Sequence, residues 1–474
     1  MQENENRNEE VRDTHDIHDA PDLAGIAERL RQKIDERDFA GFREEIGTLN
    51  PTDIAELFDE IPDEYEGRFF RLLPKEDAAR AFVDMDSDRQ KKIINSFTDR
   101  ELAEILDELF LDDTVDIIEE MPANVVKRIL RNSTPENRNI INQLLRYPKD
   151  SAGTIMTTEY VRFTKNMTVE QALDHIRRVA IDKETIYTCY VTDKDRHLLG
   201  IVTAKTLMIS PLTTRLEDIM EENVISVDTE DDKEDVAKKF DRYGFLALPV
   251  VDSENRLVGI ITIDDAMSVI HDETEEDFAK IAGMTPTETT YLKTGPFRLF
   301  LSRIPWLLLL MISATFSSTI LNRFEAALPA VLILFVPMLM DTGGNAGGQS
   351  SVTVIRGISL GELSFSDLLA AIWKELRVGI LCGAALAVVS FGKVMLVDHI
   401  IMQNPAVTVT VALAVALSLA ITVIVAKLIG CLLPLFAAKI GLDPAVMASP
   451  FITTIVDALS LLLYFAIAAG VFGL

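Results

Sequence analysis

The chain has 474 residues, 48% of them hydrophobic and 25% charged, and its formal net charge is −28. The acidity is confined to one half. The first 295 residues carry a net charge of −29, whereas residues 296–474 hold nine Lys or Arg and eight Asp or Glu. An acidic surface of this kind repels polyanions, which excludes a nucleic-acid partner. Three cysteines are too few for a disulfide-stabilised secreted scaffold.

Residues 1–22 predict a disordered acidic tail, because they are polar and lack the segments of a signal peptide. Residues 23–148 predict a helical N domain. Between Pro51 and Asn139, stretches such as PKEDAARAF and TDRELAEIL recur about every twelve residues, each beginning with a residue that favours a helix start. The pattern indicates a small superhelix of short helices that bury each other's apolar faces. Acidic pairs within it, such as Asp112-Asp113, are interpreted as solvated helix faces.

Residues 149–270 contain two related halves. GTIMTTEYVRFTKNMTVEQALDHI resembles EDIMEENVISVDTEDDKEDVAKKF, and β-branched runs follow each copy, so the pattern predicts a βαββα unit twice. The tandem looks like a CBS-domain pair, with GIVT at 200–203 and GIIT at 259–262. This resemblance implies a regulatory sensor of nucleotides or ions. The acids after Thr262 suit a ribose, but the first copy lacks them, so ATP at the CBS pair and an ion remain alternatives.

The segment 271–297 predicts a connecting helix and begins with the acidic block HDETEED. Like charges on a helix usually form a solvated face or an N-terminus that the helix dipole favours. When such carboxylates are packed together they repel each other unless a cation neutralises them, and hard divalent cations prefer oxygen ligands. The block is therefore either a solvated face or part of a divalent-cation site.

Uncharged runs predict five membrane-spanning helices in a transmembrane domain at 298–474, because a bilayer core needs roughly 20 apolar residues. They lie at about 300–322, 326–356, 370–397, 404–438 and 443–474. Of the nine basic residues, only Arg323 and Lys393 lie near one side of the membrane. The positive-inside rule therefore places the N-terminal domains in the cytoplasm and the C-terminus outside. We expect a multi-pass protein of the plasma (inner) membrane, surrounded by lipid.

The second predicted span contains the polar run PMLMDTGGNAGGQ at 337–349. Its proline and glycines are expected to loosen the helix and free backbone carbonyls, which membranes tolerate only beside protein or a water-filled cavity. If the helix persists, Asn345 and Gln349 share a face. A glycine-lined contact between helices is the structural alternative, although such a contact does not need two amides.

Asp457 is the only acidic residue well inside the fifth span, and Thr453 lies one turn before it on the same face. Intramembrane charges are costly and by default mark ion or substrate pathways. A carboxylate without Lys or Arg in its span needs a cation or a proton; a protonated Asp bonded to a neighbouring helix is the structural alternative. Walker A, HExxH and CxxC sequences do not occur, so neither an ATP-driven pump nor an enzyme is expected.

With these residues the chain resembles the MgtE-type magnesium transporter family over nearly its whole length. The most specific likeness is the span-two run, and two others are the segment at 433–444 and the helix PFITTIVD at 450–457. The resemblance implies a homodimeric Mg²⁺-selective channel with its pore on the dimer axis, so that two copies of Asp457 face each other. Mg²⁺ sheds water reluctantly, which suits paired carboxylates around a hydrated ion. The pore and ion-binding residues that the resemblance implies are Asp457, Thr453, Ser449, Asn345, Gly343, Gly344 and Gln349.

The resemblance also implies gating. Cytosolic Mg²⁺ bound between the N domain, the CBS pair and the connecting helix would close the pore, and its loss would let the acidic domains repel each other. The chain departs from the family at Gly244, where an acid is common, and at Ser449, where some relatives have Asn. The regulatory metal residues that the resemblance implies are Asp232, Glu234, Asp265, Glu273, Glu276 and Asp277.

The expected fold class is multi-domain: an all-α superhelical N-terminal domain, an α/β tandem CBS pair, a long connecting helix and a five-helix transmembrane domain. The expected function is Mg²⁺ uptake, with Mg²⁺ as the bound ion. Two other hypotheses remain. One is a CBS nucleotide-sensing membrane protein through which nothing permeates. The other is a proton- or sodium-coupled carrier for a different divalent cation, such as Co²⁺ or Mn²⁺.

Overall fold

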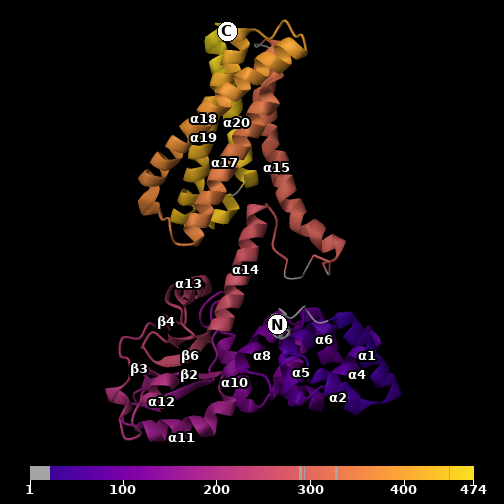
Figure 1. Cartoon of the computed structure of the whole chain (residues 1–474), viewed down its shortest axis with the longest axis vertical. Coiled ribbons are helices and arrows are strands. Elements are labelled where there is room, and N and C mark those ends of the chain that lie inside the picture. Colours follow the sequence, from indigo (N-terminus) through magenta and orange to yellow (C-terminus); the bar gives the residue numbers. More distant parts are fainter. Residues whose placement is uncertain (1–21, 288–290, 293, 326–328, 448, 474) are drawn as a thin grey trace, which may run out of the picture. The chain divides into compact units, whose positions relative to one another are not determined.

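The computed structural model describes residues 22–287, 291–292, 294–325, 329–447 and 449–473 (Figure 1). All of the predicted acidic tail except Asp22 therefore lies outside the described residues. The chain forms two compact units that divide between Met267 and Ser268. Short helices and two small sheets make up the first unit, and long apolar helices make up the second. The expected fold class is confirmed.

Short helices form the first part of the first unit, as the repeated pattern predicted. Their starts follow the local sequence: Asp86 and Thr98 each accept a hydrogen bond from a first-turn N–H group, and Pro51 opens its helix. The helices bury aromatic rings against each other, such as Phe58 and Phe69, whose centroids are 5.0 Å apart. The helices are α1 (Leu23–Glu36), α2 (Phe39–Ile46), α3 (Pro51–Leu57), α4 (Asp63–Leu72), α5 (Lys75–Val83), α6 (Ser87–Ser96), α7 (Asp99–Leu106), α8 (Leu111–Glu120), α9 (Ala123–Asn132) and α10 (Pro135–Leu144).

The two CBS copies each contain a three-stranded sheet. In each sheet the first two strands are parallel and the last two are antiparallel. The bridge between Thr157 and Ile260 joins the copies. The first copy contains β1 (Tyr160–Thr164), α11 (Val169–Val179), β2 (Thr185–Thr192), β3 (Leu198–Thr203) and α12 (Ala204–Ile209). The second contains β4 (Val227–Asp228), α13 (Lys233–Tyr243), β5 (Ala247–Val251) and β6 (Leu257–Thr262).

Helix α14 (Ile263–Ile281) follows β6 without a break. It therefore begins before the predicted connecting segment at 271 and ends well before 297. The end has a local cause, because Gly283 adopts a positive φ of 67° that favours glycine and stops a helix. The connecting helix is thus an extension of the second CBS copy.

Five apolar helices in the described part of the second unit are long enough to cross a membrane. Their extents are Pro296–Phe324, Ala330–Ser359, Phe365–Ile401, Val409–Lys439 and Pro444–Phe472, close to the predicted spans. Their main helices are α15 (Pro296–Glu325), α16 (Ala330–Ile333), α17 (Val336–Ser359), α18 (Leu368–Lys393), α19 (Val409–Lys439) and α20 (Ser449–Phe472).

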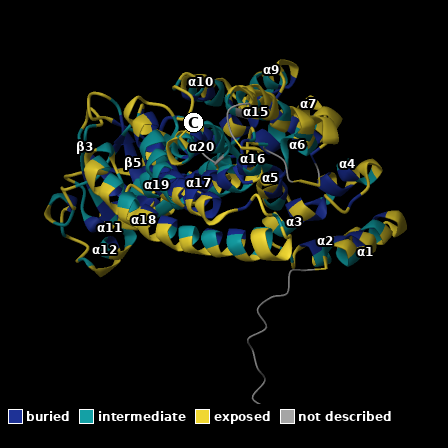
Figure 2. Ribbon diagram, turned by 90° about the horizontal axis from the view of Figure 1, so that it is seen from above, coloured by how far each residue is buried: buried dark blue, intermediate teal, exposed yellow. Residues whose placement is uncertain are grey.

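Helix α17 packs between α19 and α20, and buried residues gather where these helices meet (Figure 2). Gly430 of α19 fits this contact because a Cβ atom there would lie 2.2 Å from the backbone oxygen of Gly347. Helix α15 is different, since none of the residues in its most apolar window is buried within the chain. The core of the second unit is therefore built around α19 and α17, whose apolar windows are the most buried of the five spans.

Candidate functional site

A pocket of about 510 Å³ in the first unit is lined by carboxylates that come from distant parts of the chain. Asp112 and Asp113 lie in the first turn of α8, Glu184 directly precedes β2, and Asp264 and Asp265 lie in the first turn of α14. The acidic pocket therefore forms where the short helices meet the CBS pair.

Two carboxylates that line the acidic pocket, Asp112 and Glu184, converge with that of Glu159 closely enough to hold one ion. Asp112, Glu159 and Glu184 each place a carboxylate oxygen within 4.8 Å of the others. Asp112 is only 9% exposed. One oxygen of each group, namely Asp112 Oδ1, Glu159 Oε2 and Glu184 Oε2, is buried and accepts no hydrogen bond from the described residues. Oxygen ligands in this arrangement suit a hard divalent cation.

Burial and mutual repulsion raise the pKa values of these carboxyls. Burial, followed by repulsion from Asp112, raises the pKa of Glu159 to about 7 and that of Glu184 to about 8. The same two causes raise the pKa of Asp113 to about 8. Burial also raises the pKa of Asp265 to about 6, although a hydrogen bond from Thr262 at 2.6 Å opposes the shift. At neutral pH the pocket therefore takes up protons or a cation.

Sequence reasoning identified only part of the acidic pocket. The interpretation of Asp112-Asp113 as a solvated face is wrong for Asp112, which is buried. The sequence contains a signal for this, because Asp112 lies three residues before buried Val115 and so shares the apolar face of α8. Glu159 and Glu184 were missed. They are neighbours because β1 and β2 are parallel and the Glu184 N–H donates to the Glu159 carbonyl at 2.9 Å.

Of the predicted regulatory residues, only Asp265 lines the acidic pocket. Asp232 instead caps α13, accepting a hydrogen bond from the Glu234 N–H at 2.8 Å, and Glu234 pairs with Lys238 at 2.8 Å. Gly244 ends α13 with a positive φ of 66°, so an acid there would be strained. The departure from the family at Gly244 therefore has a local structural reason.

The predicted residues in the later part of α14, Glu273, Glu276 and Asp277, lie in the second unit. Glu276 pairs with Lys280, which also pairs with Asp443 at 2.5 Å, in the loop before α20. Asp277 accepts a hydrogen bond at 3.1 Å from the hydroxyl of Ser359, the last residue of α17. Glu273 is half-buried on the same helix. The end of α14 is thus tied to the last residue of α17 and to the loop before α20.

The polar run of the second span is an unbroken helix, contrary to the expectation that it would be loosened. Gly343 and Gly344 face inward, because a Cβ atom would lie 2.8 Å from Ser460 Oγ and 2.8 Å from Thr453 Cγ2, respectively. The glycines therefore serve close helix packing. Gly343 and Gly344 do not share a face with the predicted amides.

The opposite face of α17 carries an exposed polar stripe, consisting of Asp341, Asn345 and Gln349 at intervals of four residues. Asp457 of α20 lies nearby, since its carboxylate and that of Asp341 repel each other. Asp457 Oδ1 is buried and accepts no hydrogen bond from the described residues. The structure thus brings Asp457, Thr453 and the polar run together, and it adds Asp341, whose charge in mid-span was the available signal. The side chain of Ser449 lies outside the described residues.

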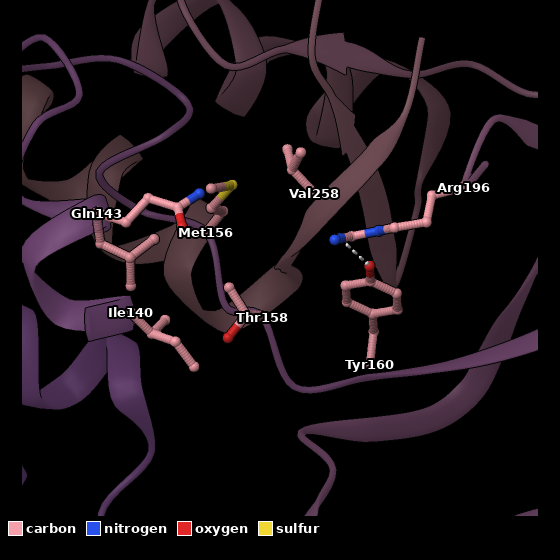
Figure 3. Close-up of a pocket in the computed structure, with 8 residues that line it drawn as sticks. Ile140, Gln143, Met156, Thr158, Tyr160, Arg196 and Val258 are labelled. Carbon is pink, nitrogen blue, oxygen red and sulfur yellow. Dashed lines mark hydrogen bonds between the residues drawn. The ribbon is translucent and has the colours of Figure 1, made fainter. Parts of the chain in front are cut away.

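A second cavity of the first unit, of about 190 Å³, lies beside α10 (Figure 3). Arg196 donates hydrogen bonds to Tyr160 Oη at 3.2 Å and to the Leu257 carbonyl at 2.8 Å, and so ties the two CBS copies together. The described lining of this second cavity contains no carboxylate, which makes the cavity unsuitable for a divalent cation. The lining residues are Ile140, Gln143, Leu144, Met156, Thr158, Tyr160, Arg196 and Val258.

Known proteins match the chain in all three of its regions. Residues 336–467 match the MgtE family described as a divalent cation transporter, residues 49–150 match the MgtE intracellular N domain, and residues 152–211 and 216–272 match the CBS domain. The magnesium transporter MgtE of Thermus thermophilus is 36% identical over 449 residues, which cover 94% of this chain and 98% of that protein. The chain belongs to the MgtE family.

Other MgtE proteins give the same result. The magnesium transporter MgtE of Bacillus subtilis is 33% identical over 90% of this chain and 93% of that protein. The crystal structure of the soluble part of a magnesium transporter aligns at 30% identity and a TM-score of 0.50, covering 53% of this chain and 99% of that chain. MgtE proteins are membrane transporters rather than enzymes.

Proposed function

We propose that this MgtE protein conducts Mg²⁺ into the cell across the plasma membrane and is closed by cytosolic Mg²⁺. Asp457 carries the proposal: its carboxylate lies in a membrane helix beside Asp341 and next to the exposed polar stripe. Two carboxylates close enough to repel each other in an apolar environment need a cation or a proton to neutralise them. Mg²⁺ keeps most of its water, so carboxylates and amides that contact its hydration shell are suitable ligands. The relatives named magnesium transporter support the choice of ion.

The exposed polar stripe also supports a homodimer. Asp341, Asn345 and Gln349 point out of the single chain, where lipid would leave a carboxylate and two amides without partners. A second copy with the same stripe would enclose a polar pathway between the two α17 helices. Asp457 of each copy would then lie beside this pathway on the symmetry axis.

The proposed orientation follows from the basic residues. Arg356 lies in the last turn of α17, while Lys374 and Arg377 lie in the early part of α18, so the short connection between these helices is basic. The positive-inside rule places this connection in the cytoplasm. The first unit is then cytoplasmic and, after five spans, the C-terminus is outside.

The acidic pocket is the proposed sensor. Mg²⁺ bound by Asp112, Glu159 and Glu184 removes the repulsion that opposes assembly of the short helices with the CBS pair. Helix α14 begins in this pocket with Asp265, and Lys280 near its end pairs with Asp443 of the membrane unit. One continuous helix thus connects the sensor to the loop before the pore helix α20.

Mg²⁺ flux into liposomes that contain the purified chain tests the pathway. We expect Asp457→Asn to abolish flux, because the ion loses its charged ligand. Asp398→Asn is the matched control, since Asp398 lies in a membrane span but pairs with Lys393 at 2.8 Å. Uptake that survives Asp457→Asn would refute Asp457 as the ligand of the pathway, and a parent chain that carries no ion would favour the CBS sensor hypothesis. Flux of Co²⁺ or Mn²⁺ that Mg²⁺ does not inhibit would favour the carrier hypothesis.

Single-channel recording with varied cytosolic Mg²⁺ tests the closure. We expect Asp112→Asn combined with Glu184→Gln to leave the channel open at Mg²⁺ concentrations that close the parent protein. The double variant should conduct as much as the parent in Mg²⁺-free solution, because the pore is unchanged. Unaltered closure would refute the acidic pocket as the sensor.

Binding of ATP at the CBS pair together with a divalent cation is a second proposal. Asp265, which was expected to hold a ribose, accepts a hydrogen bond from Thr262 and lies among other carboxylates. A triphosphate next to these groups would be repelled unless a divalent cation came with it. Titration of the full chain with ATP, with and without Mg²⁺, tests this: we expect binding at this cleft only when Mg²⁺ is present.

A further inference from the structure

A charge pair bridged by a serine lies inside the membrane unit. The Ser350 hydroxyl of α17 donates to Glu375 Oε2 of α18 at 2.6 Å and accepts from Lys427 Nζ of α19 at 3.4 Å. Lys427 is only 5% exposed, which is unusual for a charged side chain in a long apolar helix. Glu375 also lies near enough to the buried thiol of Cys431, on α19, to interact with it electrostatically. Three membrane helices therefore meet at one pair of opposite charges.

This pair is not explained by packing alone. A buried ammonium is costly, and an apolar side chain of similar volume is often neutral or stabilising at such a position. Removing only one partner of a buried pair destabilises the protein much more than replacing both, because the other charge is then uncompensated. Glu375 is thus the group that makes Lys427 tolerable, and Ser350 suits its place because one hydroxyl can donate and accept at once.

The charge pair is adjacent to the proposed ion pathway. Ser350 directly follows Gln349, the last residue of the exposed polar stripe on the same helix. In a low-dielectric environment the field of an uncompensated charge extends over several residues, and a divalent ion interacts with it twice as strongly as a monovalent ion. A net charge left on the pair, when one partner is removed, would therefore act on Mg²⁺ that passes the end of the stripe.

We propose that Glu375 cancels the charge of Lys427 and that the two residues together set the electrostatic potential at the Gln349 end of the ion pathway. They are positioning and specificity residues, which act on the ion through their field and not as its ligands. The inference rests on the proposed Mg²⁺ conduction. It predicts effects of opposite sign for the two partners, which loss of packing would not produce.

Mg²⁺ flux through the full chain in liposomes tests the proposal. The buffer on the side of the sensor contains no Mg²⁺, so that the channel stays open. We expect Glu375→Gln to lower the flux several-fold, because Lys427 is then an uncompensated cation. Lys427→Met should conduct at least as well as the parent, and the double variant should return to the parent value. Glu375→Asp, which keeps the charge, and Ser350→Ala, which keeps both charges, should stay close to the parent.

Thermal unfolding of the same detergent-solubilised variants separates the field from a structural role. If both single variants lowered flux in proportion to their melting temperatures, or if the double variant were no better than Glu375→Gln, the proposal would be wrong. Equal flux in all variants would also refute it. A parent protein that carried no Mg²⁺ would overturn the proposed function itself, whereas a conducting parent with the wrong order of variants would overturn only the role of the charge pair.

Discussion

Glu184→Gln is the perturbation that best separates the stability of the acidic pocket from its affinity for cations. Glu184 lies directly before β2, close to the carboxylates of Asp112 and Glu159. Glutamine keeps the size of the side chain and removes its charge. Without a cation we expect the variant to be more stable than the parent, and with Mg²⁺ we expect it to gain less stability than the parent does.

The magnitude follows from the pKa of Glu184, which burial and neighbouring carboxylates raise from 4.5 to about 8. Well below pH 4.5 the group is neutral in the folded and unfolded chains and costs nothing. As the pH rises toward 8, the unfolded chain ionises first, so stability falls until the folded pKa is passed. At pH 7 an isolated group of this kind costs about 3 kcal/mol. Because neighbouring carboxyls share the repulsion, we expect Glu184→Gln to recover about 1–2 kcal/mol.

Thermal unfolding of a fragment covering 22–281 measures this effect, since the soluble part of a relative has been crystallised by itself. In EDTA at pH 7 the melting temperature should rise by about 2–4 °C per kcal/mol recovered. At pH 4.5 the difference should shrink to about 0.4 kcal/mol or less, because only half of the unfolded chains then carry the charge. Glu222→Gln is the matched control, because Glu222 is exposed and does not line the pocket. The reasoning would be refuted if the variant melted below the parent in EDTA. It would also be refuted if Mg²⁺ raised the melting temperature of the variant as much as that of the parent.

Three further predictions concern packing, pH and coupling. Gly430→Ala should prevent a stable membrane unit, because its Cβ would lie 2.2 Å from the Gly347 backbone oxygen, whereas Gly470→Ala, with nothing within 4 Å, should be neutral in detergent unfolding. Lowering the pH from 8 to 6 should weaken Mg²⁺ binding to the soluble fragment in calorimetry, because protons then occupy carboxyls whose pKa values lie near 7 to 8. Lys280→Met should shift the Mg²⁺ dependence of channel closure, because the substitution removes the Lys280–Asp443 ion pair. The open-channel conductance should not change, because the substitution leaves the pore as it is.

The architecture of the membrane unit could be predicted because long apolar runs have few alternative structures. The effect of the glycines in α17 could not. Glycine loosens an isolated helix, but here Gly344 lets α17 approach Thr453 of α20, and close packing keeps the helix intact. Spacing alone shows that Asn345 and Gln349 share a face, and only the packed structure shows that this face points out of the chain.

The acidic pocket shows a different limit of sequence reasoning. Asp112 could have been found, because it lies on the apolar face of α8 where a charge needs an explanation. Glu159 and Glu184 could not, since their neighbours in the pocket come from a separate helical region and depend on how that region packs on the sheet. The family resemblance implied a cation sensor between these domains, but neither the resemblance nor the acidic surplus of the first 295 residues gave a reason to choose these carboxylates over exposed ones.

The carboxylates of the pocket come from separate elements, which determines how Mg²⁺ can act as a switch. A ligand shifts an equilibrium only by its differential affinity for the two states, and the ligand set of Asp112, Glu159 and Glu184 exists only when α8 is packed on the first CBS copy. One ion at ten times its dissociation constant supplies about 1.4 kcal/mol. Moving a two-state equilibrium from 1:99 to 99:1 takes about 5.5 kcal/mol. A pocket of about 510 Å³ that is also lined by Asp113, Asp264 and Asp265 has room for more than one ion. We therefore expect closure to depend on Mg²⁺ with a Hill coefficient above one.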